Sequence, residues 1–169
     1  MSSPSAIDVD QFKQTVGRFA TGVAVVTGST AAGPVGITCQ SFASLSLDPP
    51  LVLFCPGTGS YAWSQIRDAG NFCVNLLSDD QRDLCMRFAS KIDDRFDGVP
   101  WTPSDTGAPI LDGALSWIDC RIADVHPGGD HVIVVGEVIA VGPPDSPVSD
   151  DPLIYYRGAF GRFVEEDAT

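Results

Sequence analysis

A glycine-rich stretch near the middle of the chain has the spacing of a phosphate-binding turn. The residues from Cys55 to Trp63 read C-P-G-T-G-S-Y-A-W, so Gly57, Gly59 and Ala62 satisfy the pattern G-x-G-x-x-A. In dinucleotide-binding folds, such small residues let the backbone approach a pyrophosphate at the N-terminus of a helix. The stretch is therefore a candidate for binding the phosphate of a nucleotide.

The surroundings of this turn argue against a complete dinucleotide-binding fold. Asp79 follows Gly59 at the separation expected of a ribose-binding acid, which favours that fold. However, Pro56 interrupts the preceding strand, the helix predicted at Tyr61–Ala69 is short for a crossover, and nothing after Gly98 supplies a doubly wound sheet. We therefore interpret the glycines as a tight turn whose backbone amides can still meet a phosphate.

Four basic residues are concentrated in one short segment of an otherwise acidic chain. The formal net charge is −12, which argues against nucleic acid and anionic membranes as partners, because both need a basic face. The clustered residues are Arg82, Arg87, Lys91 and Arg95, at spacings that keep several of them on one side of a helix. Two interpretations stay open, namely a solvated helix face and a local positive site for a small anion.

Neither the histidines nor the cysteines form a catalytic or metal-binding pattern. There is no Ser-His-Asp set and no C-x-x-C pair, and no metal site is predicted. We interpret the cysteines as buried hydrophobic residues of a protein in a reducing compartment. They are Cys39, Cys55, Cys73, Cys85 and Cys120. Of the two histidines, His131 follows Gly129-Asp130 at the start of a predicted strand, and His126 lies in a turn.

Strand patterns outnumber helical patterns along the chain. Short helices are predicted at Val9–Ala20, at Tyr61–Ala69 with Gly70 as its stop, and from Asp79 or Asp80 to about Ala89. Ser44–Asp48 and Asp97–Gly113 are predicted as loops, Asp145–Pro152 as a polar connection and Glu165–Thr169 as a frayed tail. Strands are predicted at Val23–Thr27, Val35–Phe42, Leu51–Cys55, Phe72–Leu77, Ala114–Val125, His131–Val141 and Leu153–Tyr156.

These elements predict one mainly β domain over residues 1–169, with a core at about residues 9–163. Six or seven antiparallel strands with a few flanking helices would protect their edges by curling into a small barrel. The N-terminus lacks the basic and apolar regions of a secretory signal, and the apolar runs are too short to span a membrane. A cytoplasmic protein is therefore expected.

Several segments occur in an order that is typical of one protein family. They read F-A-T-G-V-A-V-V-T, G-I-T-C-Q-S-F-A-S-L-S-L-D-P-P-L-V-L-F, F-C-V-N-L-L, F-A-S-K, G-G-D-H, G-E-V and Y-Y-R-G. Over about Phe12 to Gly161 the chain resembles the short-chain flavin reductases, the reductase components of two-component flavin-dependent monooxygenases. The sequence around Cys39 most resembles that of the reductase partner of steroid-degrading aromatic hydroxylases. Many other members of the family carry Ala-Asn at the positions of Cys39 and Gln40.

The resemblance implies an FMN-binding split β-barrel with Greek-key-like strand order, and a homodimer. It also implies reduction of FMN or FAD by hydride transfer from NAD(P)H, with NADH preferred. The reduced flavin would then leave for a separate oxygenase component. Two alternatives stay open, namely a non-catalytic FMN-binding or carrier protein and a ferric reductase of the same fold.

The resemblance further implies which residues bind the flavin. Hydride transfer needs no protein nucleophile, because the cofactors carry the chemistry. Backbone amides and hydroxyls near the ring would stabilise the negative charge that develops on reduction. The residues implied along the isoalloxazine are Val35, Gly36, Ile37, Thr38, Cys39, Gln40 and Ser41. Those implied around the phosphate are Cys55, Pro56, Gly57, Ser60, Ala89, Ser90 and Lys91, with Arg87 as a weaker candidate.

The same resemblance assigns the nicotinamide cofactor to two other segments. His131 is the implied catalytic residue, and its role would be to orient NADH beside the flavin. The segment that would contact the rest of the dinucleotide comprises Tyr155, Tyr156, Arg157 and Gly158. An arginine beside tyrosines can meet a pyrophosphate and stack on a base.

Overall fold

The computed structural model describes residues 7–143 and 150–165. The helices are α1 (Val9–Val16), α2 (Tyr61–Ala69) and α3 (Arg82–Ala89), with a 3-10 turn, η1 (Asp79–Gln81), before α3. The strands are β1 (Thr21–Gly22), β2 (Ala24–Thr30), β3 (Gly33–Cys39), β4 (Ala43–Leu47), β5 (Pro50–Phe54), β6 (Asn71–Leu76), β7 (Trp101–Pro103), β8 (Pro109–Leu111), β9 (Ser116–Gly128), β10 (His131–Val141), β11 (Ile154–Tyr156) and β12 (Ala159–Gly161).

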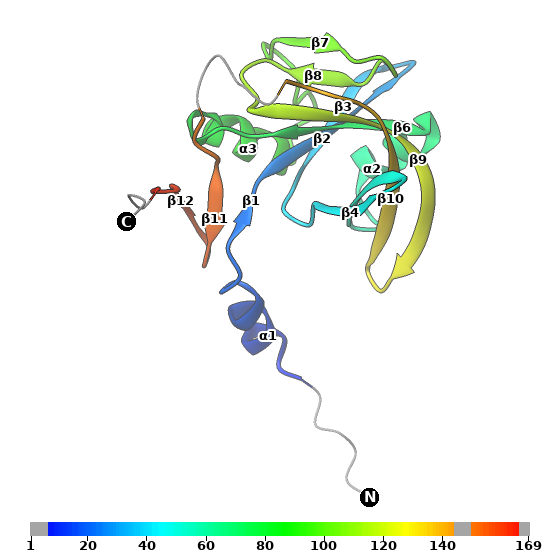
Figure 1. Cartoon of the computed structure of the whole chain (residues 1–169). Coiled ribbons are helices and arrows are strands. Elements are labelled where there is room, and N and C mark those ends of the chain that lie inside the picture. Colours follow the sequence, from blue (N-terminus) through cyan, green and yellow to red (C-terminus); the bar gives the residue numbers. More distant parts are fainter. Residues whose placement is uncertain (1–6, 144–149, 166–169) are drawn as a thin grey trace, which may run out of the picture.

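A seven-stranded antiparallel sheet forms the body of the molecule (Figure 1). Its order is β3-β2-β6-β9-β10-β5-β4, so β10 joins the long β9 on one side to β5 on the other. The β9–β10 register shifts twice, between Val135 and Gly136 and between Val138 and Ala140. Such irregularities increase the local twist and bend a sheet. The strands therefore curl around one apolar core, as the predicted barrel requires.

The main core contains large apolar side chains from both halves of the chain. Phe54 packs edge-to-face on Phe72, with ring centroids 4.9 Å apart, and Trp63 of α2 meets Phe54 at 6.0 Å. Gly136 lies directly over this cluster, because a Cβ there would stand 2.4 Å from the Phe72 ring. The glycine in the G-E-V motif is thus required by the close approach of an aromatic ring to the β10 backbone.

Helix α2 spans the residues that the sequence predicted, and it lies against the sheet. Ser60 caps its first turn by accepting a hydrogen bond from the Trp63 amide at 3.2 Å, and Gly70 ends it with a φ of 77°. Ile66 is fully buried and packs on Gly28 of β2, where a Cβ would approach within 2.9 Å. Because these contacts and caps leave little freedom, the N-terminus of α2 has a defined position.

A second apolar cluster holds α3 against the other part of the sheet. Phe88 is fully buried between Phe96, 4.9 Å away, and the backbone of β3.

The buried Asn75 side-chain amide donates to the Pro109 carbonyl at 3.2 Å and accepts from the Leu111 amide at 2.8 Å. These bonds tie the β7–β8 hairpin to β6, so the segment after α3 is anchored at both ends.

A small separate sheet and helix α1 project from the barrel (Figure 1). The strand order of this small sheet is β1-β11-β12. The turn between β11 and β12 contains Arg157 and Gly158, whose φ values are 51° and 80°. Two positive φ values in a two-residue turn are typical of a tight β-hairpin. None of the residues of α1 is buried, although Phe12 and Val16 form part of an apolar stripe.

The first helix is shorter than the predicted Val9–Ala20. Asp8 caps it as expected, by accepting hydrogen bonds from the Asp10 and Gln11 amides. It ends at Val16 because the next amides turn back over three residues, as in the bond from the Phe19 amide to the Val16 carbonyl. None of the helix's residues is buried, and a short helix without a buried face has little to extend it.

Two segments predicted as loops contain strands. Ser44–Asp48 overlaps β4, which pairs with β5, and Asp97–Gly113 contains the β7–β8 hairpin. The polar serines of β4 and the Pro-rich hairpin lack the apolar alternation that marks a strand. Backbone pairing, rather than local side-chain pattern, decides their conformation.

Two further boundaries differ from the prediction. Ser78, rather than Asp79 or Asp80, begins the turn before α3 and forms a reciprocal cap with Gln81. The final predicted strand returns as a hairpin through β12. Most of Asp145–Pro152 and of the predicted tail lies outside the described residues. Within the described part of the chain, no helix has the length and apolarity needed to cross a membrane.

Candidate active site

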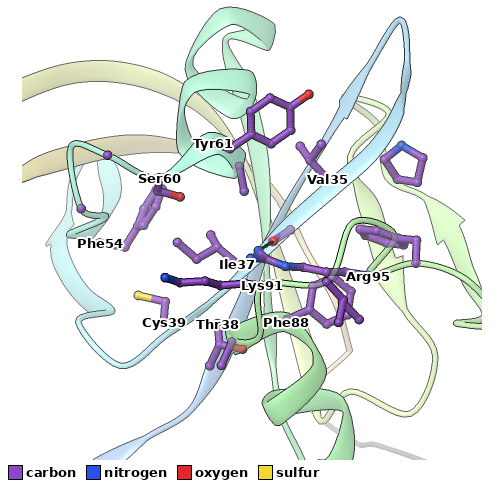
Figure 2. Close-up of a pocket in the computed structure, with 18 of the residues that line it drawn as sticks. Val35, Ile37, Thr38, Cys39, Phe54, Ser60, Tyr61, Phe88, Lys91 and Arg95 are labelled. Carbon is purple, nitrogen blue, oxygen red and sulfur yellow. Dashed lines mark hydrogen bonds between the residues drawn. The ribbon is translucent and has the colours of Figure 1, made fainter.

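A cleft of about 960 Å³ opens between β3, the N-terminus of α2, the end of β5 and the segment after α3 (Figure 2). This volume is at the upper end of the range of about 300–1,000 Å³ that is usual for small-molecule sites. Its walls combine apolar side chains such as Ile37, Phe54 and Phe88 with backbone and a few charged groups. A flat aromatic cofactor with a polar tail would suit such a mixture.

One wall of the cleft is the open edge of β3. Arg95 donates to the Gly36 carbonyl at 2.7 Å, so this carbonyl points away from the paired strand β2. In an antiparallel pair, the amide and carbonyl of one residue point to the same side, and the direction repeats every second residue. The amides of Gly36 and Thr38 therefore face outward along this edge, where they can donate to a ligand.

Gly36 is a glycine because of the side chain behind it. A Cβ at this position would lie 2.6 Å from the Phe88 ring. Phe88 is itself fully buried and cannot move aside. The G-I-T segment thus approaches α3 closely, and this places the β3 edge against the rest of the cleft wall.

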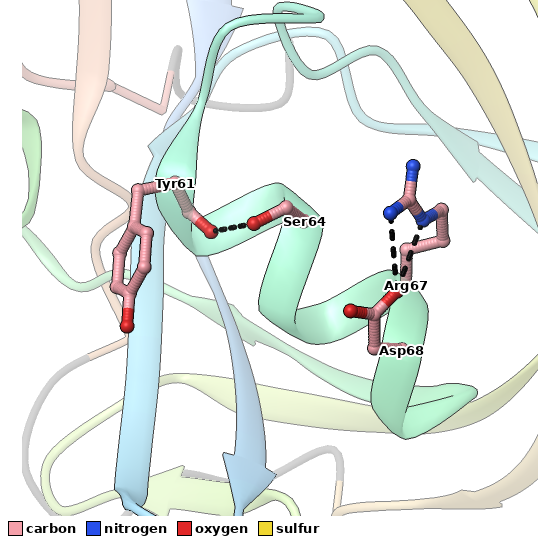
Figure 3. A network of polar contacts seen from close by, with 4 residues as sticks. All are labelled: Tyr61, Ser64, Arg67 and Asp68. Atoms are coloured by element: carbon pink, nitrogen blue, oxygen red, sulfur yellow. Dashed lines mark hydrogen bonds and ion pairs between the residues drawn. The ribbon is translucent and has the colours of Figure 1, made fainter.

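The N-terminus of α2 forms another wall. The first amides of a helix have no intrahelical acceptor, and the helix dipole favours an anion near them. Tyr61 and Ala62 occupy this first turn and line the cleft beside Ser60. Along the outer face of the helix, Ser64 bonds to the Tyr61 carbonyl at 2.8 Å and Arg67 pairs with Asp68 at 3.1 Å (Figure 3).

The glycines before α2 form a turn that is attached to β10. The Thr58 amide donates to the Asp130 carbonyl at 2.9 Å, and the Ser60 amide donates to the Gly57 carbonyl at 3.0 Å. The strand that follows α2 is β6, which pairs antiparallel with β2 and β9 rather than parallel with β5. The dinucleotide-binding fold is thereby excluded, and the interpretation as a tight turn is confirmed.

Only one of the four clustered basic residues offers an uncommitted charge to the cleft. Lys91 lines the cleft, is exposed, and has no hydrogen bond or ion pair with any other described residue. Arg82 stacks on the Phe160 ring at 4.9 Å, and Arg87 donates to three backbone carbonyls. Since α3 ends at Ala89, the proposal of one continuous basic helix face is wrong for Lys91 and Arg95.

His131 lies at the mouth of the cleft, beside Gly57. Its Nδ1 is 2.7 Å from Asp130 Oδ1, and its Nε2 would lie 3.9 Å from a Cβ at Gly57. The hydrogen bond and charge of His131 lower the pKa of the exposed Asp130 carboxyl. A carboxylate at Nδ1 favours the tautomer with its proton there, which leaves Nε2 as an acceptor in the neutral ring. The prediction of His126 in a turn is wrong, because this residue lies within β9 opposite Ile133 of β10. It pairs with Asp124 at 3.3 Å and does not line the cleft.

Most of the predicted flavin residues come together in this cleft. Those that line it are Val35, Gly36, Ile37, Thr38, Cys39, Gln40, Ser41, Cys55, Gly57, Ser60, Ala89 and Lys91, together with His131. Pro56 and Ser90 do not line it, since Pro56 is buried and the Ser90 hydroxyl donates to the Arg87 carbonyl.

Two predicted hydroxyls already have protein partners. Thr38 donates to the Cys85 carbonyl at 2.6 Å, and Ser41 bonds to both backbone groups of Cys55. In this arrangement the outward donors of the segment are its amides, while the hydroxyls hold β3 to α3 and to the end of β5. The expectation of donating hydroxyls therefore needs correction at Thr38, whose proton is committed.

The segment Tyr155–Gly158 does not reach this cleft within one chain. It forms the β11–β12 hairpin on the small sheet, where Tyr155 packs on Phe160 at 5.3 Å and the Arg157 amide donates to the Gly17 carbonyl. Several further residues line the cleft that were not predicted as flavin contacts. These are Pro34, Phe54, Gly59, Tyr61, Ala62, Phe88, Ile92, Asp93, Asp94, Arg95 and Phe96. Gly59 and Ala62 had a signal through the pattern G-x-G-x-x-A, and Arg95 had one through its place among the basic residues.

Four of the five cysteines are buried, as predicted, whereas Cys55 is only partly buried and lines the cleft. All five are free, and Cys39, Cys73, Cys85 and Cys120 are buried. Burial raises the pKa of the Cys39 thiol at the cleft wall and raises the pKa of Cys120 to about 12. Protonated thiols are poor nucleophiles, so covalent catalysis by Cys39 is not expected.

The fold and the cleft together define a mainly β protein with a cleft whose polar and apolar groups suit a phosphorylated aromatic cofactor. The whole of this arrangement corresponds to one known family. A family model described as "Flavin reductase like domain" matches residues 16–163. The chain belongs to this family, and the predictions of a flavin reductase-like chain, a split-barrel fold class and an oxidoreductase are confirmed.

Similar proteins cover almost the full length of the chain. The reductase subunit of a flavin-dependent monooxygenase from Mycobacterium tuberculosis is 46% identical over 96% of this chain and 87% of its own length. The FMN reductase (NADH) of Agrobacterium fabrum is 42% identical over 96% of this chain and 91% of its own.

Solved structures share the fold as well. Component B of a nitrilotriacetate monooxygenase from Mycobacterium thermoresistibile superposes with a TM-score of 0.89 at 46% identity, over 95% of this chain and 89% of that one. An NADH:FAD oxidoreductase from Streptomyces globisporus, bound to NAD and FAD fragments, gives a TM-score of 0.87 at 35% identity, over 95% and 96% of the two chains.

The single uncommitted cation of the cleft leads to the first prediction. We expect Lys91→Ala to weaken FMN binding about tenfold, the lower end of the effect of a hydrogen bond to a charged group, because Lys91 is exposed. Riboflavin, which lacks the phosphate, should bind both proteins equally well. Fluorescence titration with each ligand measures this, and equal losses for FMN and riboflavin would show that Lys91 acts elsewhere.

Proposed function

We propose that this protein uses NADH to reduce FMN or FAD and releases the reduced flavin to a separate flavin-dependent oxygenase. The observation that carries the proposal is one cleft that joins outward amides of β3 to the N-terminus of α2 and to Lys91. The first group of donors suits a flavin ring, and the second suits its phosphate. The names of the relatives, which include NADH-dependent FMN and FAD reductases, support the same activity.

The residues of the cleft fit a flavin by their chemistry. When bound, the flavin supplies the hydride acceptor, so the protein has to bind, orient and exclude water. The amides of Gly36 and Thr38 donate hydrogen bonds where negative charge develops on the ring. Ile37 and Phe54 provide apolar contact, and the α2 amides and Lys91 hold the phosphate.

His131 orients the nicotinamide at the mouth of the cleft. Asp130 holds the imidazole by its Nδ1, which turns Nε2 toward Gly57 and leaves it free to accept a hydrogen bond from the carboxamide of NADH. No proton has to move in hydride transfer, so His131 acts by position. Tyr155, Tyr156, Arg157 and Gly158 contact the remainder of the dinucleotide.

The protein works as a homodimer in which a second copy completes each cleft. Two features support this arrangement: the hairpin assigned to NADH lies outside the cleft of its own chain, and α1 exposes an apolar stripe. Phe12 and Val16 of α1 are 55% and 50% exposed, and Phe19, which follows the helix, is 79% exposed. An unpaired apolar helix of this kind is typical of an interaction site.

The activity itself can be tested with free flavins. We expect steady consumption of NADH that depends on added FMN or FAD and continues for many turnovers, and that is faster with NADH than with NADPH. Absorbance of the nicotinamide at constant oxygen measures it. A single stoichiometric reduction without turnover would instead indicate a flavin carrier, and dependence on a ferric complex would indicate a ferric reductase.

The role of His131 predicts a specific kinetic pattern. We expect His131→Ala to raise the KM for NADH and to slow hydride transfer, while flavin affinity stays nearly unchanged. His131→Asn should recover part of the loss, because its amide can still form a hydrogen bond. Stopped-flow flavin reduction across pH measures this for the three proteins. A required acid would make Asn as poor as Ala and would make the wild-type rate fall as imidazole loses its proton. Wild-type kinetics in both variants would show that His131 has no role in NADH binding or hydride transfer.

The dimer is tested by charging the helix. We expect light scattering to show two chains per particle at micromolar concentration, and Phe12→Glu to shift this to one chain with a higher KM for NADH. Leu47→Glu, at an exposed apolar residue of β4, serves as the matched control and should leave the dimer intact. A monomeric wild-type protein would contradict the proposed assembly.

A further inference from the structure

The loop from Ser90 to Asp97 is held mainly by side-chain bonds to its backbone. Arg87 donates through Nε to the Arg95 carbonyl at 2.7 Å and through Nη2 to the carbonyls of Asp97, at 2.7 Å, and Asp94, at 3.3 Å. The Asp94 carboxylate accepts two further amides of the loop at 3.0 Å. Because so many of its polar groups are satisfied internally, the loop is an ordered wall of the cleft.

Arg95 connects this loop to the open edge of β3. Its Nη1 donates to the Gly36 carbonyl at 2.7 Å, and its Nη2 donates to the Ser90 carbonyl at 2.6 Å. Figure 2 shows Arg95 and Lys91 projecting into the cleft, with Ile37 of β3 nearby. A guanidinium can hold two acceptors at once, because its donors form a rigid planar fork. The guanidinium is thereby committed to the protein.

Apolar packing restrains the same two segments from behind. Phe88 lies against Gly36, and Phe96, the residue after Arg95, packs edge-to-face on Phe88 at 4.9 Å and 81°. The Gly36 backbone is therefore held by a ring on one side and by the Arg95 guanidinium at its carbonyl. Arg95 also binds the carbonyl of Ser90. Because Lys91 is the next residue, this bond restrains the backbone of Lys91 as well.

We propose that Arg95 is a positioning residue for flavin binding, which fixes the β3 edge amides and Lys91 relative to one another. This role rests on the proposed function of the cleft, and it differs from that of an anion ligand, which the clustering of basic residues suggested. Loss of Arg95 therefore weakens contacts to the ring as well as to the phosphate. Lysine cannot replace it, because a single ammonium does not span two carbonyls in a fixed plane.

The test compares Arg95→Lys and Arg95→Gln with the wild-type protein in equilibrium titrations with FMN and with riboflavin, without NADH. We expect both variants to bind riboflavin about tenfold more weakly, as for the loss of a charge-assisted bond, and FMN at least as much more weakly. Lys91→Gln is the matched control for loss of a cleft cation, and it should affect FMN alone.

Two results would overturn the proposal. Wild-type FMN affinity in Arg95→Lys would show that charge alone matters, and a loss for FMN with unchanged riboflavin binding would make Arg95 a phosphate ligand. A wild-type protein that binds neither flavin refutes the proposed function instead, and it does so before any variant is compared.

Hydrogen exchange of the apo proteins supplies a second measurement that does not depend on flavin. At a temperature well below the midpoint of thermal unfolding, the backbone amides of Arg95→Lys should exchange faster than those of the wild type. The increase should occur both in peptides that cover residues 34–40 and in peptides that cover residues 90–97. Unchanged exchange in both segments would refute the positioning role. If Arg95→Gln does not fold, Arg95→Lys carries both measurements.

Discussion

The pairing of β10 with β5 is the constraint on which the rest of the structure depends. β10 already pairs with β9 along most of its length, so its second partner joins the late strands to the early ones. This continues the sheet around the core that contains Phe54, Phe72 and Trp63, and it leaves neither β5 nor β10 as an edge. It also places the turn after β5 against the start of β10, where Gly57 and His131 meet.

The seven-stranded sheet ends in two edge strands, β3 and β4, and β3 is the one that lines the cleft. Its position is set from behind by Phe88, which fits only because residue 36 is a glycine, and from the cleft side by Arg95. A strand edge offers regularly spaced amides that are already desolvated on one side. Such preorganised donors stabilise developing charge without having to reorient during the reaction.

The charge distribution of the chain suits a transient cofactor. A net charge of −12 repels anions from most of the surface, so the local donors of the cleft have to outweigh that field. Because Arg82 and Arg87 are committed to protein contacts, Lys91 is the uncommitted member of the basic cluster. A single exposed lysine with helix amides favours binding that is specific but reversible, as the proposed release of flavin to an oxygenase requires.

Local chemistry along the sequence determined the class of fold, the helix α2 with its stop at Gly70, the β9–β10 hairpin and, by family resemblance, most of the cleft residues. Alternation of apolar residues and turn-forming glycines are short-range properties, so they can be recognised without a structure. Only the tertiary structure decided the rest. It showed β4 and the β7–β8 hairpin as strands, because β4 pairs with β5 on the edge of the sheet and Asn75 of β6 holds the hairpin. It committed the Thr38 hydroxyl and the Arg87 and Arg95 guanidiniums to protein acceptors, and it placed Tyr155–Gly158 outside the cleft of its own chain. Which donor meets which acceptor depends on side-chain reach across the folded molecule, and spacing along the chain does not contain that information.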